Sequence, residues 1–232
     1  MQFVEVSVTG VRTAVITLRR EQTPMTFELF AMVHLGSSDY YHSVTERLRD
    51  CELIVAEGVS GGSLVTKALS LAYRLPGRSR RLGLMEQRID YARLGIPVIC
   101  PDLTAEQFRQ GWRAVPLLQR LAMWCVVPPA ALAVRIFGTR RFLARHMSLD
   151  DLPTEQDHLE RAVAGELMEL IVDHRDGVLI EALASIHDER CDEPVVVAVV
   201  YGAGHMPAVV RALLARYGYR PRSAEWLTVF EL

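Results

Sequence analysis

Residues 195–207 read Val-Val-Val-Ala-Val-Val-Tyr-Gly-Ala-Gly-His-Met-Pro, and this stretch decides the fold class. Residues 195–201 form an apolar run without a polar interruption, as in a strand that is buried on both faces of a sheet. Gly202 and Gly204 allow the backbone to turn sharply, and Pro207 suits the first position of a helix. The stretch therefore predicts a buried strand that leads through a tight turn into a helix.

The same alternation of apolar strand and helix recurs outward from this stretch. Further strands are predicted at residues 27–33, 53–56 and 97–100. Helices are predicted at residues 38–48, 63–73 and 84–94, from residue 104, from residue 154 through residue 170, around residues 180–183 and after residue 206. Such alternation is typical of an α/β fold.

The two ends of the chain predict antiparallel additions to this sheet. Residues 4–8 and 11–18 alternate at period two around Thr9-Gly10, which indicates a β-hairpin. Residues 226–232 indicate a C-terminal edge strand. We expect one α/β domain over residues 1–232, with a largely parallel mixed sheet, helices on both faces, and a helical insertion over about residues 104–150.

The composition excludes several classes of protein. The 26 basic and 28 acidic residues give a net charge of -2, which argues against a nucleic-acid partner. The four cysteines are scattered without a Cys-x-x-Cys pair, so neither a disulfide framework nor a thiolate zinc site is expected. The N-terminus lacks the basic start and uninterrupted apolar stretch of a secretory signal. We therefore expect a cytoplasmic protein.

One apolar segment within the insertion stands out. Residues 121–134 carry no charge, but Arg120 and Arg135 close the segment before it reaches the about 17–25 residues that a membrane span needs. We therefore expect no transmembrane span. Residues 115–138 are instead expected to be covered, for example in a homodimer, or to touch a membrane shallowly.

Four polar residues follow the predicted strands at the point where each strand ends: His34, Glu57, Asp102 and His205. The carboxyl ends of parallel strands meet at one edge of a sheet, where ligands bind in open α/β folds. We call this edge, with these four residues, the rim. Two imidazoles and two carboxylates suit a divalent metal ion with nitrogen and oxygen ligands. A single histidine in a strand-to-helix loop can also have a purely structural role, so it is the joint placement of the four residues that indicates a metal site.

A serine hydrolase is an alternative interpretation. Residues 58–62 read Gly-Val-Ser-Gly-Gly and fit the G-x-S-x-G pattern between a predicted strand and a predicted helix. Ser60, Asp102 and His205 also stand in the chain order of a hydrolase triad. The competing reading of residues 58–62 is a glycine-rich loop on the substrate side.

Five motifs together resemble the TraB, or pheromone-shutdown, family, which is related to the TIKI metalloproteases and more distantly to the erythromycin esterases and a haem-binding lipoprotein. In chain order they are Ala31-Met-Val-His34-Leu-Gly36-Ser-Ser, Val-Ala-Glu57-Gly58, Asp102, Val-Asp-His174-Arg175-Asp176, and Val-Val-Tyr-Gly202-Ala-Gly204-His205-Met. The resemblance runs from about residue 27 to the end. The chain departs from the family at Ala31, where relatives have glycine, and at Leu103, where relatives have arginine.

The resemblance implies a metal-dependent, peptidase-like site. It implies His34, Glu57 and His205 as metal or catalytic residues, with Arg175 as a polar partner at the rim. The reaction expected from these residues is metal-assisted hydrolysis of an amide or ester bond, with Mn²⁺, Co²⁺ or Zn²⁺ lowering the pKa of a bound water.

Several roles stay open at this point. Glu57 is either a third ligand or the general base, and Asp102 belongs to the catalytic set. Arg175 either stabilises an oxyanion or clamps a substrate carboxylate, or it forms a salt bridge with Asp102 or Asp176. Contacts to a peptide or small-molecule substrate are expected from Gly36, Ser37, Gly202, Gly204 and Gln87. The alternative function is a protein of the same fold that binds a metal ion, haem or a peptide without turnover.

Overall fold

The computed structural model describes residues 1–232 apart from residues 59–73, 78, 148–164, 166 and 168. The described strands are β1 (Val4–Val6), β2 (Gly10–Arg19), β3 (Thr26–Met32), β4 (Leu35–Gly36), β5 (Leu53–Ala56), β6 (Met85–Glu86), β7 (Val98–Ile99), β8 (Val196–Gly202) and β9 (Arg220–Glu231). The described α-helices are α1 (Ser38–Leu48), α3 (Ala105–Ala114), α4 (Leu117–Phe137), α5 (Arg140–Arg145), α7 (His174–Arg190) and α8 (Met206–Tyr217). Short 3-10 turns cover Tyr91–Leu94 and Ala203–His205, and a π-helical turn covers Glu169–Asp173.

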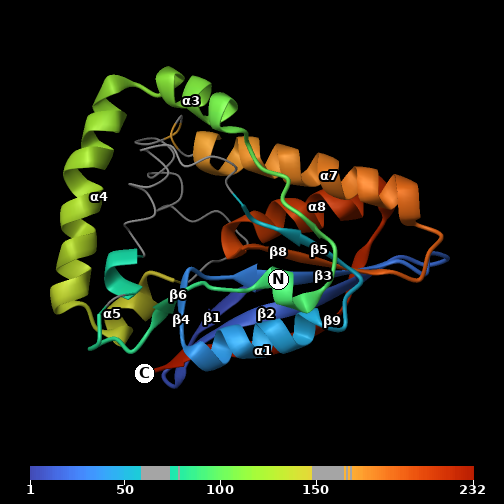
Figure 1. Ribbon diagram of the computed structural model, residues 1–232, viewed down its shortest axis with the longest axis horizontal. Helices are drawn as coiled ribbons and strands as arrows, with labels where there is room; N and C mark the ends of the chain where they lie inside the picture. Colours follow the sequence, from blue (N-terminus) through green and yellow to red (C-terminus); the bar gives the residue numbers. More distant parts are fainter. Residues whose placement is uncertain (59–73, 78, 148–164, 166, 168) are drawn as a thin grey trace.

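The main sheet is mixed, and its central strands are parallel. β3, β8, β5 and β7 are neighbours in that order and run in the same direction. β2 runs antiparallel to β3, and its other edge pairs with β9 from one end to the other. α7 and α8 lie on one face of this sheet and α1 lies on the other (Figure 1). The predicted α/β fold with an antiparallel N-terminal hairpin and C-terminal edge strand is confirmed.

β8 forms the centre of the core, as its sequence predicts. Val199 pairs with Leu29 of β3 on one side and with Val55 of β5 on the other. Residues 197–200 have no exposed surface. The strand is apolar along its length because helices cover both faces, so no position alternates toward solvent.

Two predictions about residues 84–100 are wrong in part. Residues 84–94 were expected to be helical, but β6 pairs with β4, and the N–H of Gln87 donates to the carbonyl of His34 at 3.0 Å. The backbone therefore bonds across to another segment instead of to itself, and only the 3-10 turn remains. β7 is a strand as predicted, but it is a short edge strand whose Val98 and Ile99 are exposed instead of buried.

The predicted insertion is confirmed as three helices, α3, α4 and α5. α3 begins with the expected capping box, in which Thr104 and Gln107 bond each other's backbone N–H. α4 contains Pro128 and Pro129, and within the described residues it is a helix long and apolar enough to cross a membrane by length and composition. The expected absence of a transmembrane span stays a prediction. The helix predicted at residues 63–73 lies outside the described residues, as does most of the one predicted from residue 154.

Candidate functional site

The topology brings the four expected residues to one edge of the sheet. The strands that precede them are β3, β8, β5 and β7, which are adjacent and parallel, so His34, His205, Glu57 and Asp102 follow their carboxyl ends in that spatial order. The expected rim is therefore present. Its residues differ in exposure, because His34 is exposed, whereas His205 is buried and the carboxylate of Asp102 is almost completely covered.

Arg175, at the start of α7, joins the two carboxylates of the rim. Its Nε and Nη2 donate to the two oxygens of Asp102 at 2.9 and 2.7 Å, and Nη2 also donates to Oε1 of Glu57 at 2.7 Å. The side chains of Arg175, Glu57 and Asp102 are only 10%, 15% and 1% exposed. Of the roles left open for Arg175, the salt bridge to Asp102 is present, and the guanidinium is oriented by it. We regard Arg175 as a residue that positions Glu57.

The electrostatic environment keeps Glu57 ionised. Burial raises the pKa of Glu57, but Arg175, His34, His205 and the Gly202 N–H together outweigh burial and lower the pKa below its ordinary value. The other carboxylate oxygen, Oε2, accepts that N–H at 2.9 Å. A carboxylate with a lowered pKa is a weak proton acceptor. The geometry therefore favours Glu57 as a fixed negative charge over Glu57 as the general base.

His205 is held by a carboxylate that the sequence analysis did not assign to it. Its Nδ1 lies 2.6 Å from Oδ1 of Asp176, which is in the first turn of α7, and the two side chains are 8% and 13% exposed. An ionised carboxylate only accepts hydrogen bonds, so Nδ1 carries the proton and donates it. The neutral ring then has its lone pair on Nε2. The adjacent Arg175-Asp176 pair in the sequence could have suggested that one helix turn serves two rim residues.

Gly202 allows the close approach between β8 and Glu57. A Cβ at this position would lie 3.3 Å from Oε2 of Glu57 and 3.6 Å from Cδ2 of His205. A Cβ here would be tight against Glu57 and in ordinary van der Waals contact with His205. Gly204 has no atom within 4 Å of the equivalent position among the described residues, so it faces open space.

Gly36 and Ser37 have structural roles at the start of α1. A Cβ on Gly36 would lie 2.8 Å from Cδ1 of Tyr40, and the Ser37 hydroxyl caps the helix by accepting the Tyr40 N–H at 3.1 Å. Their expected contact with substrate stays a prediction.

Tyr91 lies near Glu57 and Cys100, and the sequence analysis did not single it out. Burial raises the pKa of Tyr91, the nearby Cys100 and Glu57 raise it further, and a side-chain hydrogen bond with Gln87 lowers it. The backbone N–H of Gln87 also donates to the carbonyl of His34, so Gln87 lies beside the rim although it is on no helix, and its expected contact with substrate stays a prediction. The signal that could have pointed to Tyr91 is its spacing, because it stands four residues after Gln87 and would share one face with it on the helix expected over residues 84–94.

The expected metal ligands do not form a complete centre by themselves. Within the described parts of the chain, no group of three or more His, Cys, Asp or Glu side chains is arranged to hold a metal ion. Of the three expected ligands, His205 has Nε2 available, whereas both oxygens of Glu57 already accept hydrogen bonds. Ser60, the nucleophile of the alternative interpretation, lies outside the described residues.

Comparison of the chain with protein-family models, with curated proteins and with solved structures finds no match. The resemblance to the TraB family therefore rests on the motifs themselves, and it stays a prediction.

Proposed function

We propose that the chain is a hydrolase of amide or ester bonds, and that Nε2 of His205 activates the attacking water. The observation that carries this proposal is the 2.6 Å bond between Asp176 and Nδ1 of His205 at the carboxyl edge of the sheet. A histidine whose Nδ1–H is held by a carboxylate presents Nε2 as a base and is stabilised when it becomes protonated.

The remaining rim residues fix the charge around this base. Nε2 accepts the proton of water as the oxygen attacks the carbonyl carbon, and the same proton then goes to the leaving group. Asp176 stabilises the imidazolium of His205 while the ring holds that proton. Glu57, whose pKa is lowered by its neighbours, stays an ionised carboxylate beside this base. Arg175 holds Glu57 and Asp102 in place and thereby limits repulsion between the two carboxylates.

A divalent metal ion is the cofactor that the TraB resemblance implies. His205 could give Nε2 to such an ion, since carboxylate–histidine pairs commonly support metal ligands. The described donors do not assemble a three-ligand set. For this reason no step of the proposed reaction passes through a metal ion. Peptides are the substrate class that the same resemblance favours, with small esters as the second class to test, in a cytoplasmic setting.

The test compares hydrolysis of p-nitrophenyl esters and of fluorogenic peptides by the wild type, His205→Ala, Asp176→Asn and the control His42→Ala. His42 is an exposed histidine of α1. Loss of the base should lower kcat by about 100-fold or more in His205→Ala. Asp176→Asn should lower kcat as well, because an amide can hold the ring in the wrong tautomer, whereas His42→Ala should match the wild type. Circular dichroism confirms that each variant is folded.

The outcomes separate the alternatives. Equal hydrolysis by the wild type and His205→Ala contradicts the proposal. Loss of activity with a chelator, restored by Mn²⁺, Co²⁺ or Zn²⁺, assigns His205 to a metal-dependent form of the same hydrolase. Labelling by a fluorophosphonate that Ser60→Ala abolishes would move the reaction to Ser60. Tight retention of a metal ion, haem or peptide without hydrolysis would identify a binding protein.

A further inference from the structure

The outer surface of α4 is apolar and exposed. Of its 21 residues, Met123 and Ala131 are buried. Four of its exposed large aliphatic side chains follow each other at spacings of 3, 11 and 4 residues, each close to a whole number of helical turns, so they share one side of the helix, with exposed fractions between 48% and 78%: Leu118, Leu121, Leu132 and Ile136. We call these four residues the aliphatic stripe. Trp124 and Cys125 are exposed on the same helix.

The charge around the aliphatic stripe is one-sided. Residues 107–149 contain seven of the 26 basic residues and none of the 28 acidic residues, although the whole chain is slightly negative. The seven are all arginines: Arg109, Arg113, Arg120, Arg135, Arg140, Arg141 and Arg145. They lie on both sides of the uncharged residues 121–134, most of them near the ends of α4.

Among the residues that the structure describes, most of these arginines have no acidic partner. Arg109 pairs with Glu106, and Arg140 donates to the carbonyls of Leu82 and Glu231. Within the described residues, no carboxylate forms an ion pair with Arg113, Arg135, Arg141 or Arg145. The surface thus combines unneutralised positive charge with an exposed aliphatic stripe.

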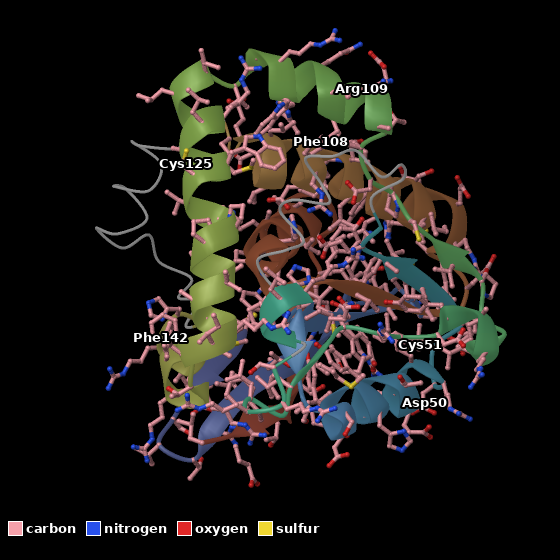
Figure 2. The ribbon with its side chains drawn as sticks, turned by 60° about the vertical axis from the view of Figure 1, so that its left-hand side comes forward. Asp50, Cys51, Phe108, Arg109, Cys125 and Phe142 are labelled. Carbon is pink, nitrogen blue, oxygen red and sulfur yellow. The ribbon has the colours of Figure 1, made fainter. Side chains whose placement is uncertain are left out.

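Both ends of α4 are attached to the same folded body (Figure 1). At one end, Phe108 and Val115 pack in a small core with Leu170. At the other end, Arg140 bonds the chain near β9, and Ala144 is buried in the main core. Figure 2 shows Phe108 on α3 and Phe142 on α5 near these two ends, with Cys125 on α4 between them. A helix tied at both ends to one side cannot cross a bilayer without detaching from one of them.

The prolines of α4 also favour an interfacial position. Pro128 and Pro129 have no N–H, so the carbonyls of Trp124 and Cys125 receive no donor from the helix at these positions. Water can donate hydrogen bonds to such carbonyls at the level of the lipid headgroups, whereas the hydrocarbon core of the bilayer contains no water.

We infer that the aliphatic stripe of α4, together with the flanking arginines, binds the surface of an anionic lipid bilayer, with α4 lying in the plane of that surface. Aliphatic side chains enter the boundary between headgroups and acyl chains, and arginines at the ends reach lipid phosphates. A second copy of the chain fits less well, because a two-fold contact through this surface would set one arginine-rich face against another. This inference is independent of the hydrolase proposal.

The test measures binding of the full chain to vesicles of phosphatidylcholine alone and of phosphatidylcholine with phosphatidylglycerol, by flotation. Leu121→Glu/Leu132→Glu removes the stripe, and Val8→Glu/Leu214→Glu makes the same change at exposed apolar residues elsewhere. Arg141→Gln/Arg145→Gln removes positive charge, and Arg211→Gln/Arg220→Gln makes the same change at exposed arginines of α8 and of the start of β9. Trp124 adds a fluorescence readout, taken as the difference from Trp124→Phe.

Binding is expected to be about tenfold or more stronger to the anionic vesicles, to weaken with added salt, and to fall in both test variants but in neither control. The emission of Trp124 should shift to shorter wavelength on binding. Equal or no binding to the two kinds of vesicle overturns the inference. A dimer in light scattering that Leu121→Glu/Leu132→Glu disperses, without vesicle binding, assigns the surface to a second copy. Binding that resists high salt and alkaline extraction would indicate a span and would also overturn it.

Discussion

The two most apolar stretches of the chain have opposite surroundings. Residues 197–200 of β8 have no exposed surface, whereas α4 buries Met123 and Ala131 and exposes most of its other large side chains. Overall hydrophobicity does not separate these stretches, but residue type does. β8 is rich in valine, which suits a packed sheet, and α4 has leucine and alanine between arginines. The comparison teaches that an apolar run indicates burial only when its neighbours in the fold can cover it.

The rim adds a second contrast with α3, α4 and α5, which we call the α3–α5 arm (residues 105–145). The carboxylates and the arginine at the rim are buried and paired, whereas most charges on the arm are exposed and have no ion-pair partner among the described residues. Stability is therefore expected to depend strongly on the sheet and its rim and weakly on the arm surface. Four predictions test this difference, from the largest expected effect to the smallest.

Arg175→Met should destabilise the protein by about 3–5 kcal/mol, because it leaves Glu57 and Asp102 buried without their shared partner. Arg145→Met on the arm should change the free energy of unfolding by less than about 0.5 kcal/mol. Urea unfolding at neutral pH measures both. A small effect at Arg175 would mean that the two carboxylates are protonated or hydrated in solution.

Leu29→Ala and Leu118→Ala make the same substitution in the two regions. Leu29 is fully buried in β3, and Leu118 is 78% exposed on α4. Leu29→Ala should cost about 2–5 kcal/mol through lost burial and a cavity, and Leu118→Ala less than about 0.5 kcal/mol. Thermal unfolding of both variants gives the comparison. Similar losses would show that a partner or another part of the chain covers α4.

Gly111→Ala tests the small core that attaches the arm to α7. A Cβ at Gly111 would overlap Cδ1 of the buried Leu170, so the variant should lose about 1–3 kcal/mol. Gly177→Ala is the matched control within α7, where the Cβ would meet no atom of the described residues within 4 Å. It should gain about 0.5–1 kcal/mol from helix propensity. A stable Gly111→Ala variant would mean that α3 moves away from α7 at little cost.

The pH dependence of stability from Glu57 is expected to be the smallest effect, because burial opposes the partners that lower its pKa. The folded pKa lies below the ordinary value of 4.5, so the unfolded chain takes up this proton at higher pH. The stabilisation from ionised Glu57 is fully present above the ordinary pKa of 4.5, and it is lost as the pH falls through the lower pKa of the folded state. Urea unfolding between neutral and acidic pH should show a shallower decline for Glu57→Gln than for the wild type and the control Glu106→Gln. If the free energy of unfolding of Glu57→Gln fell with pH as steeply as that of the wild type, the lowered pKa of Glu57 would be contradicted.

The strands and the rim could be predicted from the sequence because both depend on short, local patterns. An apolar run followed by a polar residue marks each carboxyl end, as at Val33-His34 and Ala56-Glu57, and parallel pairing then brings those ends together. The sequence also indicated Asp102 or Asp176 as the salt-bridge partner of Arg175, and Asp102 is the one that Arg175 bonds.

The remaining features depend on contacts between distant segments. The partner of Asp176 could not be identified as His205 from local sequence, because the bond requires α7 to lie beside the end of β8. The segment that contains Tyr91 has a helix-like apolar spacing, but its backbone pairs with Leu35 and Gly36 instead. The exposure of Val98 follows from the place of β7 at the edge of the sheet, which hydrophobicity does not encode.

The position of β8 between β3 and β5 has a consequence for synthesis of the chain. Residues 196–202 are made after both neighbouring strands, and β9, the partner of β2, is made later still. Until then the edges of β3 and β5 have unpaired N–H and C=O groups that can pair with other chains. The same order means that the rim forms only when His205 has emerged from the ribosome. A translation product that ends before β8 would expose the unpaired edges of β3 and β5 and would lack His205 of the rim.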